Sequence, residues 1–182
     1  MGIRKRAVRG CTALVSSVVI ALPVVAAVAP AKAADAAAQP GGQVVISELA
    51  NGGPGGYHDN FIEIANWGDE PVDVSGWELF RCTGTGSVAS APQNTLQGTI
   101  GAGERWLFAR ESDQSTIADA DVEQRYSTSL ANESYGALLR DSSGEDVDAV
   151  AVQFPGTANQ ACGEGTVLAN TTDSAAGESF QR

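Results

Sequence analysis

Short apolar runs separated by clusters of Gly, Asp, Asn and Ser make up most of this chain after its first forty residues. The runs are rich in Val, Ile, Leu and aromatic residues, which is the pattern of β-strands joined by turns. Many short strands of this kind indicate an antiparallel sandwich or barrel. The runs that we expect to form strands lie at residues 43–50, 60–66, 77–83, 105–110, 135–140, 147–153 and 178–182.

The size and composition of the chain fit one domain with its own core. It has 182 residues, of which 43% are hydrophobic and 18% charged. This balance excludes a long disordered tail, a collagen-like repeat and a multi-span membrane protein, and it leaves little room for a second domain.

Two polar segments are expected to connect strands. Residues 112–125 contain Ile117 and Val122 five positions apart, which is poor helical spacing, so we expect a long surface loop with room for one helical turn. Residues 141–146 lie between two apolar runs and predict a hairpin connection. Their acids could hold calcium, but the fixed ligand positions and terminal Glu of a calcium loop are missing, so we favour a turn.

The first 33 residues have the order of a secretory signal peptide. Basic residues at positions 4–9 precede an apolar stretch at 11–29, and Ala31-Lys32-Ala33 supplies the small residues of a cleavage site. The alternative is an uncleaved anchor, because the apolar run approaches the ~20 residues that cross a bilayer. We favour cleavage between Ala33 and Ala34, which predicts a secreted, extracellular protein without a membrane span and a flexible lead-in at 34–42.

The chain beyond the predicted cleavage site is strongly acidic. Its 6 arginines stand against all 22 Asp and Glu residues, which gives a net charge of −16, compared with −11 for the whole chain. Such a surface repels phosphate backbones, so unaided nucleic-acid binding is disfavoured. The same charge suggests a calcium-stabilised envelope protein as one hypothesis, and we expect no other cofactor.

Cys82 and Cys162 are the two cysteines outside the predicted signal peptide. An even pair in an exported chain predicts one disulfide, and the alternative is two separate buried thiols. No Cys-x-x-Cys motif is present, so a thiol redox role has no support.

Glu48 and Glu63 are acids inside apolar runs. A pair of facing carboxylates can perform acid–base chemistry or bind a metal. Alternation, however, places Glu63 opposite the face of Ile62 and Ile64. We therefore favour two carboxylates that point to solvent or accept hydrogen bonds from a neighbouring loop.

His58 is the only histidine. It follows the glycine-rich residues 52–56, which we interpret as a mobile loop and which lack the Lys-Ser/Thr of a phosphate loop. Its neighbour Asp59 is badly placed to orient its ring for a Ser-His-Asp site, and one histidine cannot make the usual zinc site. We expect neither catalysis nor a metal centre, and keep Glu48, Glu63 and His58 as candidate binding residues.

Six segments form a recognisable series. They read VISEL at 45–49, DNFIEIAN at 59–66, VDVSGWEL at 72–79, LQGTIGAGERWL at 96–107, LLRD followed by VD at 138–148, and ESFQR at 178–182. This series resembles the bacterial lamin-tail domain, whose motifs I-x-E, F-I-E-L-x-N, V-D-L-S-G-W-x-L, L-x-G-T-I-x-A-G, a hairpin ending in V-D and a late S-x-x-R strand follow one another in this order.

The resemblance implies an immunoglobulin-like antiparallel β-sandwich over residues 43–182. Within it we expect structural roles for Asn66 at the end of a strand, Gly76 in a turn with positive φ, Trp77 beside a buried strand, and Asp148 in the V-D pair. Family members occur in secreted bacterial proteins, often beside nucleases, phosphatases or other hydrolases as a non-catalytic module.

Two functions remain open on this basis. The first is a secreted, non-catalytic module that binds an extracellular protein, an envelope component or a polymer. The alternative is the N-terminal accessory domain of a secreted endonuclease or phosphohydrolase whose catalytic part is absent from this chain. Family members usually continue past the point that corresponds to Arg182, so we expect either a trimmed domain or the front part of a longer protein.

Overall fold

A computed structural model describes residues 44–131, 134–153, 162, 168–169 and 179–181. The predicted signal peptide, its cleavage position between Ala33 and Ala34, and the lead-in at 34–42 lie outside these residues. The elements are β1 (Val44–Ala50), η1 (Tyr57–Asp59), β2 (Phe61–Asn66), β3 (Val72–Asp73), β4 (Glu78–Cys82), β5 (Asn94–Thr95), β6 (Thr99–Ile100), β7 (Arg105–Arg110), η2 (Asp119–Asp121), β8 (Gln124–Tyr126), β9 (Tyr135–Arg140), β10 (Asp146–Gln153), β11 (Leu168–Ala169) and β12 (Phe180–Gln181).

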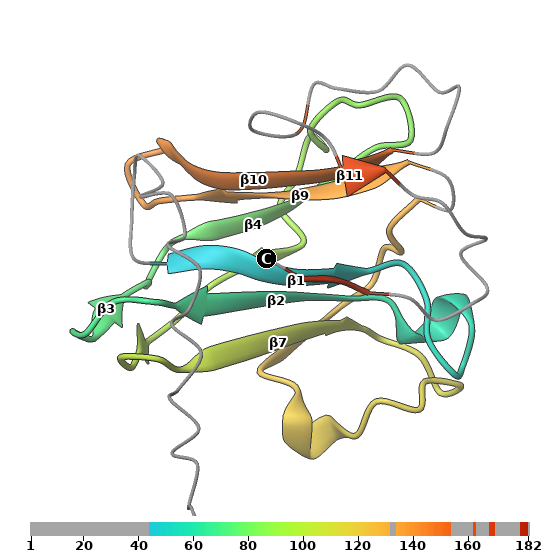
Figure 1. Ribbon diagram of the computed structural model, residues 1–182, viewed down its shortest axis with the longest axis horizontal. Helices are drawn as coiled ribbons and strands as arrows, with labels where there is room; N and C mark the ends of the chain where they lie inside the picture. Colours follow the sequence, from blue (N-terminus) through green and yellow to red (C-terminus); the bar gives the residue numbers. More distant parts are fainter. Residues whose placement is uncertain (1–43, 132–133, 154–161, 163–167, 170–178, 182) are drawn as a thin grey trace, which may run out of the picture. The chain divides into compact units, whose positions relative to one another are not determined.

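Two five-stranded sheets face each other across one core. The first sheet has the order β12-β1-β2-β7-β8, and the second has the order β11-β10-β9-β4-β5. In Figure 1, β10, β9 and β4 lie in one layer and β1, β2 and β7 in the other. The pairs β7–β8 and β10–β11 are parallel, and the remaining pairs of both sheets are antiparallel. This arrangement confirms the predicted immunoglobulin-like antiparallel β-sandwich.

Alternating side chains from both sheets fill the core. Ile62 and Ile64 of β2 are fully buried, whereas Glu63 between them points to the outer face. In β1 the pairing shifts between Ile46 and Glu48, which is a β-bulge. Because of this bulge, Ile46 and Leu49 both reach the core although three positions separate them.

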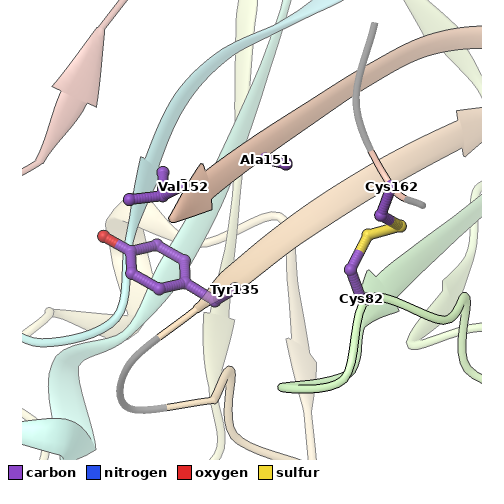
Figure 2. A pocket seen from close by; sticks show the side chains of 6 residues that line it. Cys82, Tyr135, Ala151, Val152 and Cys162 are labelled. Carbon is purple, nitrogen blue, oxygen red and sulfur yellow. A yellow bond between two sulfur atoms is a disulfide. The ribbon is translucent and has the colours of Figure 1, made fainter. Parts of the chain in front are cut away.

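The outer face of the second sheet is also apolar, and a disulfide covers part of it. Phe80, Leu138 and Ala149 form a second buried cluster with Cys82 and Cys162. The predicted disulfide between the two cysteines is present, with their Cα atoms 5.9 Å apart. Figure 2 shows it at the end of β4, and the cavity beside it is about 10 Å³, enough for one water-sized sphere.

Two side chains connect the sheets along opposite edges of the sandwich. On one edge the buried Asp148 of β10 accepts a 2.6 Å hydrogen bond from the backbone N–H of Ile46 in β1. The short strand β12 pairs with later residues of β1, so it does not supply a partner for this N–H. On the opposite edge, Asn94 of β5 donates through Nδ2 to the carbonyl of Arg125 in β8, at 3.2 Å.

The connections differ from the sequence prediction in small ways. The expected loop at 112–125 contains one helical turn, η2, but its last two residues already pair with β7 as part of β8. Residues 141–146 make the predicted hairpin turn between β9 and β10. In the described part of the chain, no helix is long and apolar enough to cross a membrane.

Gly136 provides the space that the disulfide occupies. A Cβ atom at this position would overlap the carbonyl oxygen of Val150 and lie 3.2 Å from Sγ of Cys82. We therefore expect Gly136→Ala to lower the free energy of unfolding by about 1–3 kcal/mol in urea titrations. Gly84→Ala is the matched control, because its Cβ would lie 3.6 Å from its nearest neighbour, Cβ of Ala131. Equal losses in the two variants would contradict this explanation.

Candidate functional site

The strand register brings Glu48 and Glu63 directly opposite each other on the outer face of the first sheet. Oε1 of Glu63 accepts hydrogen bonds from Arg105 and Ser47, both at 2.6 Å. Oε2 of Glu48 accepts one from Gln181 at 3.1 Å. These partners offset the repulsion between two facing carboxylates. The contacts therefore link β12, β1, β2 and β7, and each acid has a structural partner of its own.

Asp59 connects the glycine-rich loop at 52–56, between β1 and β2, to a distant part of the chain by hydrogen bonds. This side chain is 1% exposed. Its carboxylate accepts hydrogen bonds from the backbone N–H of Gly55, from the N–H and hydroxyl of Thr116, and from the hydroxyl of Ser115. Asp59 thus joins the β1–β2 connection to the β7–β8 connection.

Hydrogen bonding decides the charge of Asp59. Burial acts to raise its pKa, but the donors on Thr116, Gly55 and Ser115 outweigh burial, and the pKa is lowered from its ordinary value. The group is therefore a carboxylate with a structural task. Its partners Ser115 and Thr116 are 56 and 57 positions away, so no local sequence pattern could have revealed them.

Tyr57 and His58 lie on η1 beside Arg110 and Ser112, and we call these four residues the Tyr57 cluster. Tyr57 is 55% exposed. The guanidinium of Arg110 lies 5.0 Å from the centre of the Tyr57 ring, and its NH1 donates to the Tyr57 carbonyl at 3.2 Å. The His58 ring centre is 4.0 Å from that of Tyr57, and its Nδ1 is 2.8 Å from the Ser112 hydroxyl.

The Tyr57 cluster is better suited to binding than to nucleophilic catalysis. A serine nucleophile needs a base that a third group orients. Asp59 does not orient the His58 ring, as the sequence predicted, because its oxygens bind the loop. Nδ1 of the His58 ring lies 2.8 Å from the Ser112 hydroxyl and 3.5 Å from NH1 of Arg110. The cluster instead offers an aromatic face, a cation and a hydroxyl.

The remaining motif residues have structural positions. Asn66 is fully buried and donates to the carbonyl of Ile100, and its side chain also bonds to the turn that follows β2. Gly76 has a φ of 79°, which is a left-handed conformation that favours glycine. Trp77 packs, partly buried, against the core that contains Leu79.

Asp141 closes the hairpin turn on itself. Its Oδ1 accepts hydrogen bonds from the hydroxyl of Ser143 at 2.7 Å, the N–H of Ser143 at 2.8 Å and the N–H of Glu145 at 3.0 Å. The bonds from Ser143 and Glu145 lower the pKa of this carboxyl group. Within the described ranges, no three His, Cys, Asp or Glu side chains are grouped so that they could hold a metal ion.

One end of the sandwich collects several connections, and we call it the loop end. The registers place Phe61, Ala109, Tyr126, Cys82 and Gly136 there, at the starts of β2 and β9 and the ends of β4, β7 and β8. The short 3-10 helix η1, which carries Tyr57 and His58, lies at this end, and β3 lies at the other (Figure 1).

A groove of about 410 Å³ also opens at the loop end, and no sequence pattern had indicated it. It is lined by Arg81 and Thr83, by residues 88–93 of the β4–β5 connection, and by Ser127 and Thr128 of the β8–β9 connection. The segments that form this groove are distant in the sequence and belong to both sheets.

The lowered pKa of Asp59 predicts a pH-dependent contribution to stability. A carboxyl group whose pKa is lower in the folded state stabilises that state above its unfolded pKa of about 3.9, and the stabilisation is lost as the pH falls through the folded pKa. We expect Asp59→Asn to be less stable than the wild type at pH 7, and the difference to shrink below about pH 4. Urea unfolding at several pH values measures this. Asp113→Asn, an exposed change on the β7–β8 connection that Asp59 contacts, should show neither effect.

Comparison with known proteins agrees with this architecture. The model of one family, the Lamin Tail Domain, matches residues 37–153. A comparison with curated proteins finds no match. The family match spans β1 to β10 and includes the motif residues Asn66, Gly76, Trp77 and Asp148, whereas Cys162 lies beyond it. The chain therefore belongs to the lamin tail domain family.

Proposed function

We propose that this protein is exported and acts outside the cell as a non-catalytic interaction module, with the loop end as its binding face. Lamin tail domains are a family of immunoglobulin-like domains, and sandwiches of this kind commonly bind through loops gathered at one end. The Tyr57 cluster is the single observation that carries the proposal. It presents an exposed aromatic ring braced by an arginine, and Tyr and Arg are residues that dominate binding energy at interfaces.

Two further features support the non-catalytic and extracellular parts of the proposal. Three acids within or beside the strands make structural contacts: Glu63 with Arg105, Asp59 with the β7–β8 connection and Asp148 with Ile46. The disulfide and the signal-like first 33 residues are typical of an exported chain. The partner is an extracellular protein or a polymer of the cell envelope.

Tyr57→Ala should weaken capture of this partner from the envelope and medium of the producing cells by at least about tenfold, because it removes the exposed ring of the cluster. The measurement is a pull-down with immobilised protein, quantified across protein concentrations. Trp67→Ala is the matched control. Tyr57 and Trp67 are the two exposed large hydrophobic residues of the described chain, and they flank opposite ends of β2.

Three results would count against the proposal. Equal loss of capture in both variants would show that the loop end is not the binding face. Hydrolysis of nucleic acid or phosphoesters by the purified protein, abolished by Glu63→Gln, would show an enzyme. A secreted form that keeps its first 33 residues, instead of a mass of roughly 15 kDa, would contradict signal cleavage.

A further inference from the structure

None of the described residues that line the groove at the loop end is acidic, although the chain carries 22 acids and a net charge of −11. Its volume of about 410 Å³ lies within the range of small-ligand sites. Its lining consists of one arginine, hydroxyl and amide side chains, and small apolar residues. A ligand that carries negative charge would therefore meet less repulsion here than over most of the surface.

Arg81 is the cation of this groove, and it differs from the other arginines that the structure describes. Three of those arginines form ion pairs with carboxylates, and Arg110 lies over the ring of Tyr57. Among the described arginines, Arg81 is the one whose side chain makes no hydrogen bond, ion pair or ring contact. A guanidinium presents five N–H donors in a planar fork that fits a carboxylate with two parallel hydrogen bonds.

The hydroxyl groups of Ser90, Ser127 and Thr128 line the same groove. They add donors that can complete the coordination of a carboxylate bound to Arg81. The side chain of Gln93 donates to the carbonyl of Thr128 and so joins the two connections that form the walls. The groove is thus held by the fold itself, between the edges of the two sheets.

The wall formed by residues 88–93 is the outer edge of the second sheet. The N–H groups of Ala89 and Gln93 donate to the carbonyls of Arg81 and Leu79, which holds this segment along β4. Ser90 and Ala91, between these two anchors, are exposed. An extended peptide can add hydrogen bonds to an exposed sheet edge of this kind. As far as the structure describes the lining, it offers no aromatic side chain on which a base or a sugar ring could stack.

We propose that this groove binds the carboxylate of an extended peptide, with Arg81 as the anchor and residues 88–93 as the edge along which the peptide backbone lies. The carboxylate comes from the peptide C-terminus or from an acidic side chain. This inference rests on the proposed function as an extracellular interaction module. It uses residues outside the Tyr57 cluster, so the two proposals can fail separately.

Three acetylated tetra-alanine peptides test the inference by NMR titration of the isotope-labelled protein. The first has a free C-terminal carboxylate, the second a C-terminal amide, and the third an amide with glutamate at the third position. We expect the first or the third peptide to bind at least tenfold more tightly than the second, and the one that does so identifies the source of the carboxylate. The shifted amide signals should belong to Arg81, residues 88–93, Ser127 and Thr128.

Arg81→Gln should weaken this binding at least tenfold, and Arg105→Gln is its control. Arg105→Gln changes the net charge equally but lies on the outer face of the first sheet, paired with Glu63. Arg81→Lys keeps the charge and loses the planar fork, so it should bind the peptide more weakly than the wild type. This variant replaces Arg81→Gln in the test if Arg81→Gln does not fold. Any of three results would overturn the inference. The Arg81 and Arg105 variants could weaken binding equally, all three peptides could bind alike, or glucuronic acid could bind while no peptide does. Trp67→Ala, just beyond the other end of β2, should leave peptide binding unchanged.

Discussion

The hydrogen bond from the Ile46 N–H to the Asp148 carboxylate joins the two sheets of this sandwich along one edge. Asp148 is 2% exposed, and a charged group is stable in such a place when hydrogen bonds replace its water. The Ile46 N–H lies next to the bulge of β1, beyond the reach of β12. A buried acid and an unpaired strand N–H therefore satisfy each other, and this fixes β1 against β10.

The opposite edge of the sandwich is connected by weaker means. There the neutral amides of Gln93 and Asn94 reach the backbone carbonyls of Thr128, just after β8, and of Arg125 in β8, and Oδ1 of Asn94 is buried without a hydrogen-bond partner. A smaller hollow of about 180 Å³ near Trp106 and the groove of about 410 Å³ near Arg81 both border this edge. The two sheets are thus joined by the carboxyl group of Asp148 along one edge and by neutral amides along the other. The hollow and the groove at the second edge leave room for a ligand.

The same physical logic separates structural acids from binding residues. Asp59, Asp148 and Glu63 each accept strong hydrogen bonds within the fold, and these bonds position loops and strands. The Tyr57 ring and the Arg81 guanidinium have free faces, and both lie at the loop end. This end of an acidic protein therefore carries an exposed aromatic ring and a cation, two kinds of side chain that favour binding.

Local patterns allowed the main strands to be predicted, because each buries alternate side chains. Ile62 and Ile64 show this alternation in β2, and the Gly76–Trp77 pair marked the turn before β4. Strands of two or three residues, such as β5 and β8, have no period to detect, and the bulge at Ser47 breaks the alternation of β1.

The candidate binding residues could be predicted only in part. His58, one of the three candidates, lies at the loop end. Glu48 and Glu63, the other two, make structural contacts on the outer face of the first sheet. The groove around Arg81 depends on contacts between distant segments, such as Gln93 and Thr128, which are 35 positions apart and which no local pattern connects. Folding creates this site, so the sequence alone gave no indication of it.

Removal of the Asp148 carboxylate tests the central claim most directly. In Asp148→Ala, amide hydrogen exchange at Ile46 should accelerate and the free energy of unfolding should fall by about 1–3 kcal/mol, because a buried N–H loses its acceptor. Asp146→Ala removes an acid two residues away whose side chain is 55% exposed, and it should change stability by less than about 1 kcal/mol. Equal small effects in the two variants, with the Ile46 amide still protected, would contradict the account.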